Sequence, residues 1–209
     1  MAHRPAVTPS SALIVTAIAP PIVGADDLAD AFLQDTLDKA SHPCVGARVT
    51  VASVGNPADA AQIGNAPGAR LVQMTGERIR EGADRVALIG SNVPHLPAAY
   101  LAEAFGRLGR GDAAADVVLG PSERGGCYLV ALRAGVPDPG LFWGLPWTDE
   151  SILEVTRGRA RALGLRVAHL PRWYEIGTAA DLVRLRRDLN RGVVDAPHTA
   201  AALLSMVAR

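Results

Sequence analysis

The sequence predicts an α/β fold, a three-layer α/β/α sandwich with a mainly parallel (mixed) sheet. Continuous apolar runs over 12–18 and 86–89 are typical of strands that are buried on both faces. Segments with the apolar spacing of helices alternate with these runs, which indicates βαβ units whose right-handed crossovers place helices on both faces. With 209 residues the chain suffices for one such domain. We expect that domain over 12–209, after a flexible polar tail over 1–11.

The expected elements follow one another in chain order. Strands are predicted at 12–18, 48–53, 71–73, 85–89, 116–119, 127–132 and 165–170. Helices are predicted at 26–39, 98–108, 149–162, 182–189 and 197–209, with a weak short helix in 56–70 and a helical turn at 77–81. Pro97 suits the first turn of its helix because its missing N–H costs nothing there. Thr178 and Asp181 match a capping box that opens the helix after them.

Composition excludes several classes of partner. Hydrophobic residues make up 49% of the chain and the formal net charge is +0, so neither nucleic acid nor an anionic membrane surface is indicated. No stretch reaches the roughly 18 to 20 apolar residues of a membrane span. Pro20 and Pro21 interrupt the first apolar run, which argues against a secretory signal and favours a cytoplasmic protein. Cys44 and Cys127 lack metal-site spacing, and we expect both to be buried, unpaired and inert.

Two strand-end turns carry the chemistry. Gly90-Ser-Asn-Val-Pro-His-Leu-Pro97 and Gly120-Pro-Ser-Glu-Arg-Gly-Gly-Cys-Tyr128 each follow an apolar run, so both lie at the carboxyl edge where open α/β sheets bind ligands. The glycine pair in the second turn lets the backbone approach a ligand closely, and Tyr128 is a candidate wall of the pocket. A divalent ion here would need carboxylates, but Asn92 and Arg124 occupy those positions.

Two further segments complete an ordered pattern. They read Leu141-Phe-Trp-Gly-Leu-Pro-Trp147 and Trp173-Tyr-Glu-Ile-Gly-Thr-Ala-Ala-Asp-Leu182. From about residue 12 to 189 the chain resembles the glycosyltransferase A-like family of radical-SAM/selenodomain-associated transferases, with its GSDxPxLP, LGPxxDGGYYLIGL, LFxxIPW and W/LYDVDTPxDL motifs. The resemblance implies the fold of the nucleotide-diphospho-sugar transferase superfamily, and a nucleotide or nucleotide sugar with an unknown acceptor as ligands.

The departures from this pattern fall on functional positions. Asn92 and Arg124 replace acids of the first two motifs, and Glu175 and Gly177 stand where the last motif has two acids. The family also carries basic residues after its first strand, whereas 19–27 contains no Lys or Arg. Arg124 could replace the charge of a metal because a guanidinium fork pairs well with phosphate oxygens. One positioned carboxylate would then serve as the base.

The resemblance and these departures define the expected site. The candidate catalytic residues are Glu123 and Glu175. The candidate binding residues are Thr16, Ser91, Asn92, Pro94, Arg124, Gly125, Gly126, Tyr128 and Trp173. We assign no metal ligand; Mg²⁺ or Mn²⁺ would be a cofactor only if Asn92 and Glu175 coordinate it. We expect Trp143, Trp147 and Trp173 to pack structurally rather than stack on an acceptor.

Three functions remain open from the sequence. The preferred one is a glycosyltransferase-like protein that binds a nucleotide or nucleotide sugar without the usual divalent-metal site. The first alternative is a catalytically inactive transferase scaffold with a binding or regulatory role. A nucleotidyltransferase shares the superfamily, but the missing basic residues after the first strand disfavour it. A homodimer is left open.

Overall fold

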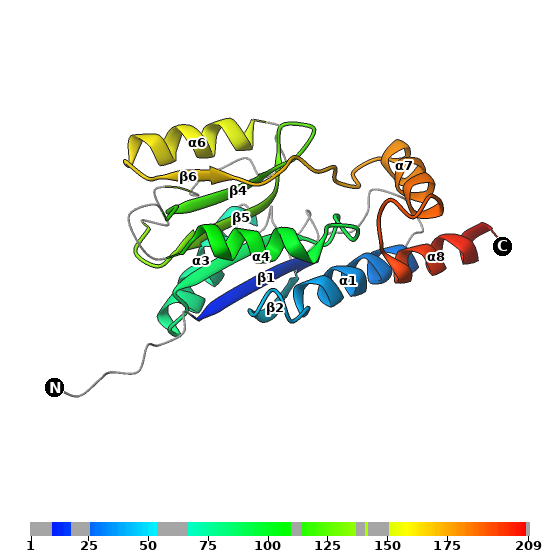
Figure 1. The fold of residues 1–209 in the computed structure, drawn as a ribbon, viewed down its shortest axis with the longest axis horizontal. Helices are drawn as coiled ribbons and strands as arrows, with labels where there is room; N and C mark the ends of the chain where they lie inside the picture. Colours follow the sequence, from blue (N-terminus) through cyan, green and yellow to red (C-terminus); the bar gives the residue numbers. More distant parts are fainter. Residues whose placement is uncertain are drawn as a thin grey trace.

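The computed structural model describes residues 10–17, 26–53, 67–109, 114–136, 141 and 151–207. One six-stranded sheet organises them, in the order β2-β1-β3-β5-β4-β6 (Figure 1). The strands are β1 (Ser11–Ala17), β2 (Arg48–Ser53), β3 (Arg85–Gly90), β4 (Val117–Pro121), β5 (Cys127–Arg133) and β6 (Val167–His169). The helices are α1 (Asp26–Ala40), α3 (Pro67–Arg80), α4 (Ala98–Arg107), α6 (Ile152–Ala162), α7 (Ala179–Asn190) and α8 (Pro197–Val207).

The sheet is mixed, with one reversed strand. β1 pairs in parallel with β2 and β3, and β4 pairs in parallel with β6. β5 runs antiparallel to both β3 and β4. Because β5 follows β4 through a short turn, the second strand-end turn is a hairpin at the carboxyl end of β4. The predicted α/β fold class is confirmed.

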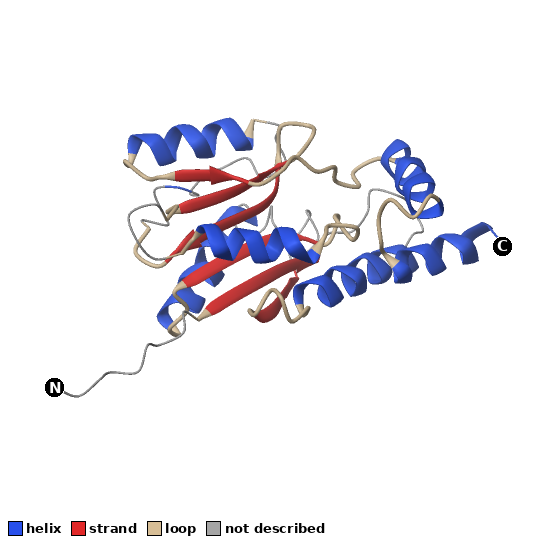
Figure 2. Ribbon diagram, viewed as in Figure 1, coloured by secondary structure: helices blue, strands red, loops and turns tan. Residues whose placement is uncertain are grey.

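Alternate side chains of the buried strands pack against helices on opposite faces of the sheet. Figure 2 shows these helices as blue ribbons around the red strands. On one face Leu13, Ile89 and Leu129 join a core that includes α4. On the other face Ile14 and Leu88 pack against α3, and Leu119 and Leu132 lie in the cluster that α6 completes. Side chains of successive strand residues point to opposite faces, so continuous apolar runs are required for this burial.

Helices α7 and α8 pack at the end of the sheet rather than over its middle. Their apolar residues gather around Leu28 and Phe32 of α1, together with Tyr174 and Ile176 from the segment before α7. Figure 1 shows these two helices beyond the carboxyl ends of β1 and β3. They therefore wall one side of the edge where the strand-end turns lie.

The sequence prediction was wrong over 71–81. Pro67–Arg80 is one helix rather than a short strand followed by a helical turn. Met74 and Ile79 pack beneath the sheet with this helix, and a short apolar run cannot by itself distinguish such a helix from a strand. The part of the weak helix predicted over 56–66 lies outside the described residues.

Smaller boundary differences occur elsewhere. Ser11 belongs to β1 rather than to the tail, and Pro97 is the N-cap of α4, in extended conformation, rather than its first helical residue. The last strand covers only Val167–His169. Helix α6 begins at Ile152, and residues 149–150 lie outside the described part. The capping box is confirmed, because the Thr178 hydroxyl accepts a hydrogen bond from the Asp181 amide.

The cysteine prediction was half wrong. Cys44 is exposed in the turn after α1, where its Sγ lies 3.0 Å from His42 Nδ1. Residues 41–43 of the same turn are exposed as well, so the turn leaves the thiol uncovered. Cys127 is partly buried, and burial together with the charge of Glu175 raises the pKa of its thiol to about 12. Among the described helices none has the length and apolarity needed to cross a bilayer.

Candidate functional site

Backbone hydrogen bonds bring three segments together at the carboxyl edge of the sheet. The Ser91 amide donates to the Thr16 carbonyl at 2.9 Å, so the turn after β3 begins against the end of β1. The Ile176 amide donates to Asn92 O at 2.8 Å, and the Glu123 amide donates to Trp173 O at 3.0 Å. The segment 173–177 therefore bridges the two strand-end turns, which the sequence alone could not show.

Asn92, Gly126 and Glu175 meet where these segments cross. Asn92 Nδ2 donates to Glu175 Oε1 at 3.4 Å. A Cβ added to Gly126 would lie 3.6 Å from Glu175 Oε2. The partly buried Glu175 side chain thus lies between the ends of β3 and β4, and Gly126 leaves room beside its carboxylate. Three of the residues predicted for the site therefore lie next to one another.

The Arg124 guanidinium reaches the start of α7. Its Nη2 donates to both carboxylate oxygens of Asp181 at 2.6 Å and to Thr178 Oγ1 at 3.2 Å. A Cβ on Gly177 would lie 3.4 Å from Arg124 Nη1. Burial would raise the pKa of Asp181, but hydrogen bonds from Thr178 and Gly177 and the Arg124 charge hold it below its usual value. Arg124 thus occupies the space beside residue 177.

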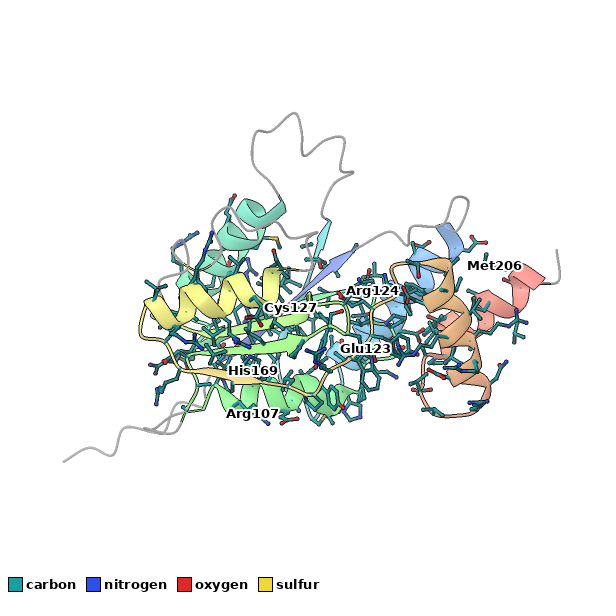
Figure 3. All side chains as sticks on the ribbon, turned by 90° about the horizontal axis from the view of Figure 1, so that it is seen from above. Arg107, Glu123, Arg124, Cys127, His169 and Met206 are labelled. Atoms are coloured by element: carbon teal, nitrogen blue, oxygen red, sulfur yellow. The ribbon has the colours of Figure 1, made fainter. Side chains whose placement is uncertain are left out.

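Glu123 makes a second link to α7. Both of its carboxylate oxygens accept from Arg184, at 2.6 and 3.0 Å. The hydrogen bond from Arg184 lowers the pKa of Glu123. The Arg184 guanidinium carbon also lies 3.7 Å from the centroid of the Tyr174 ring, a cation–π geometry. Figure 3 shows Glu123 and Arg124 on the side of the hairpin turn that faces α7.

Several predicted binding residues are buried. Thr16 is 6% exposed and donates its hydroxyl to Ile89 O at 3.0 Å, within the sheet. Ser91 and Pro94 are also buried. Tyr128 was expected to wall a pocket, but its ring is 2% exposed and its hydroxyl donates to Pro171 O at 2.9 Å. That ring lies against Gly120, where an added Cβ would meet it at 2.6 Å, so Tyr128 belongs to the core.

Trp173 packs in an aromatic cluster. Its ring centroid lies 5.4 Å from that of His95 and 5.5 Å from that of Tyr100, and it contacts the main core. This agrees with the packing role expected for Trp173, whereas Trp143 and Trp147 lie outside the described residues. Gly125 adopts a φ of 93°, a conformation that favours glycine and lets the hairpin turn close.

Sequence reasoning missed three residues of this region. Asp181 and Arg184 hold the hairpin turn from α7, and His95 is buried between Trp173 and Tyr174. Opposite charges at Glu123–Arg124 and at Asp181–Arg184 were visible in the sequence. Their pairing was not, because it depends on where α7 is placed. Burial, then the positive charge of Arg184, lowers the pKa of His95 to about 3.

The described side chains do not form a divalent-metal site. No three His, Cys, Asp or Glu residues within the described ranges gather as metal ligands. At the expected position Glu175 is joined by a neutral amide, and the guanidinium of Arg124 lies beside Gly177, two residues away. Because a hard cation needs several anionic oxygens and is repelled by a fixed positive charge, these residues do not fit one.

Comparison with solved structures defines the class of fold. A candidate nucleotide-diphospho-sugar transferase from Desulfovibrio desulfuricans G20 superposes with a TM-score of 0.75 at 24% identity, with 96% of each chain covered. CMP:2-keto-3-deoxy-manno-octonic acid synthetase, in complex with CTP, gives a TM-score of 0.60 at 14% identity, over 88% of this chain and 99% of that one. The molecule therefore has the fold of nucleotide-diphospho-sugar transferases.

The chain belongs to the family described as "Uncharacterized protein conserved in bacteria (DUF2064)", whose model matches residues 27–149. No curated protein matches the sequence. The matched residues include both strand-end turns, and with them Asn92 and the hairpin turn. It does not reach Glu175 or α7.

Proposed function

We propose that this protein is a nucleotide-sugar-related transferase that binds a nucleotide or nucleotide sugar between its two strand-end turns, with Arg124 in place of a divalent cation. One observation carries the proposal. The guanidinium of Arg124 occupies the space beside Gly177, the position where the resembled family has a carboxylate. A fixed positive charge and the loss of an acid therefore coincide in space. A guanidinium can pair with two phosphate oxygens, as a metal ion would.

Each neighbouring group has a role in this proposal. Arg124 releases Asp181 and pairs with the diphosphate of the ligand instead. The half-buried backbone at Gly125 and Gly126 lets that diphosphate approach. Glu175 is the better candidate base, since both oxygens of Glu123 are already held by Arg184. In transfer, Glu175 takes the proton of an acceptor hydroxyl, the acceptor oxygen bonds to the anomeric carbon, and the nucleoside diphosphate leaves with the electron pair.

Titration calorimetry against a panel of nucleotides and nucleotide sugars tests the binding step. We expect saturable binding of at least one compound, with an affinity that 1 mM Mn²⁺ leaves unchanged. Arg124→Gln should weaken binding by roughly tenfold or more, because it removes a charge-assisted contact of about 1.5 to 3 kcal/mol. Arg186→Gln, an exposed arginine on α7, is the control and should bind like the wild type. No binding across the panel would overturn the proposal.

A product assay separates the remaining functions. A sugar transferase releases a nucleoside diphosphate, and Glu175→Gln should abolish this release while leaving binding intact. A nucleotidyltransferase, suggested by the CTP complex of the second structural neighbour, would release pyrophosphate from CTP instead. Binding without release of either product would indicate the inactive scaffold. Metal-dependent turnover by the wild type would contradict the role given to Arg124.

A further inference from the structure

The strand β6 leaves one side of its backbone unpaired within the described sheet. It lies at the end of the strand order and, among the described strands, pairs only with β4. Val117 N donates to Arg166 O, and Leu170 N donates to Leu119 O. Backbone groups of alternate residues in a parallel ladder face opposite sides, so those of Val167 and His169 face away from β4. These four groups could pair with another extended chain.

A groove runs beside this edge, between α6 and β6. Its lining residues are Arg157, Arg161, Gly164, Leu165, Val167 and His169. The two arginines are one helical turn apart on α6, so they lie on the same face of the helix. Leu165 and Val167 supply an apolar floor that is partly buried against the adjoining core. In Figure 3 His169 lies on β6, next to α6.

The groove is positively charged. Arg157 pairs with Glu154 at 3.2 Å, but both side chains are exposed, at 40% and 65%. Burial and the charges of Arg157 and Arg107 lower the pKa of His169, with Glu154 opposing them. Arg107 itself is paired with Glu103. Arg161 adds a further cation with no carboxylate opposite it among the residues that line the groove. An occupant of this groove must therefore carry negative charge.

A second copy of the chain does not suit this edge. Pairing of β6 with β6 of another copy around a twofold axis would place the Arg157 and Arg161 groove of each copy against the same groove of the other. Like charges brought together in this way oppose association. An extended acidic segment of a different protein meets both requirements, since its backbone can pair with Val167 and His169 while its carboxylates meet the arginines.

We propose that the β6 edge, with the α6–β6 groove, is a docking site for an extended acidic peptide segment of a partner protein, which adds to the sheet as a strand. Charged side chains at a sheet edge also prevent indiscriminate pairing, so they admit an acidic strand and reject neutral or basic ones. The site is independent of the ligand site proposed at the carboxyl edge.

The test uses the full chain and a blocked peptide of alternating valine and glutamate. We expect saturable binding, weakened by added salt, together with slower amide hydrogen exchange at Val167 and His169. The double variant Arg157→Gln with Arg161→Gln should lose about tenfold in affinity, as expected for two exposed charge pairs. Arg157→Lys with Arg161→Lys should retain most of it, and Arg186→Gln should match the wild type. All three positions lie on helix surfaces, so we expect every variant to fold like the wild type.

Three results would overturn this inference. The first is equal binding of the same peptide with glutamine in place of glutamate. The second is peptide binding without slower exchange at Val167 and His169, which would indicate charge attraction alone. The third is full competition by inorganic pyrophosphate with no change in exchange at β6, which would indicate a small-anion site.

Discussion

The two strand-end turns differ in what holds them in place. The β3 turn, residues 91–97, has five of its seven residues buried and contributes Val93 and Leu96 to the main core. The hairpin turn, residues 122–126, exposes Glu123 and Arg124 and is tied to α7 by their ion pairs. Packed side chains hold the first turn, whereas backbone hydrogen bonds and partly exposed ion pairs hold the second.

This difference assigns separate tasks to the two turns. Packed side chains have no alternative partners of equal energy, so the β3 turn is a rigid platform. Ion pairs that are partly exposed contribute little stability and exchange readily with other charges. The hairpin turn can therefore present Arg124 to a phosphate without unfolding anything. Substitutions in the β3 turn should reduce stability, and those in the hairpin turn should change ligand binding.

The largest expected effect is Leu96→Ala in the β3 turn. Leu96 is 1% exposed, and removing most of its side chain leaves a cavity, which should lower the free energy of unfolding by about 3 kcal/mol. Urea denaturation measures this loss. The control Val183→Ala removes an apolar side chain that is 71% exposed and should cost far less. Equal losses in the free energy of unfolding for the two variants would contradict the prediction that packing holds this turn.

The pH dependence of stability probes the same turn through His95. Its pKa of about 3 in the folded state lies below the ordinary 6.5, so the unfolded chain binds more protons between these values. Stability due to His95 is complete above about pH 6.5 and falls, by up to about 1.4 kcal/mol per pH unit, as the pH drops toward 3. His95→Leu should reduce this slope, measured by urea denaturation from pH 7 to 5. An unchanged slope would contradict the prediction.

In α7, Asp181→Asn removes the ion pair with the hairpin turn and should cost only about 1 kcal/mol at pH 7, because the exposed partner Arg124 is well solvated. The lowered pKa of Asp181 means that the unfolded state binds the proton more tightly. Its contribution is therefore present above about pH 4 and is lost as the pH falls through the lower folded pKa. The thermal unfolding midpoints of the variant and the wild type should converge in acid.

The Asp181→Asn variant should also bind the nucleotide ligand more tightly, because Arg124 no longer has to leave Asp181.

The smallest effect is expected for Arg184→Gln. Glu123 and Arg184 are 45% and 37% exposed, and such pairs contribute about 0.5 kcal/mol that added salt screens. The difference in urea midpoint between variant and wild type should shrink when NaCl is raised to 1 M. A loss of stability as large as that of Leu96→Ala would contradict the difference between a turn held by packing and a turn held by exposed ion pairs.

The sequence predicted the fold more completely than the site. Buried strands are visible locally where an apolar run of strand length is bounded by breakers, as 12–18 is by Pro20 and Pro21. Helix α3 was missed because its apolar face is recognised only against the sheet beneath it. Asn92 and Glu175 were singled out from motif positions, and in the structure they are in contact. The links from Arg124 to Asp181 and from Glu123 to Arg184 span 57 and 61 residues, a separation that no local pattern encodes.

The sequence by itself determined that this chain is an α/β protein with two polar turns at one sheet edge and without the usual acids there. These features depend on residue type and on spacing along the chain. Only the tertiary structure decided that Tyr128 is core, that Arg124 fills the space beside Gly177, and that β6 borders a cationic groove. Each of these depends on how α6, α7 and the sheet pack. Packing arises from contacts between residues far apart in the chain, which local propensity does not specify.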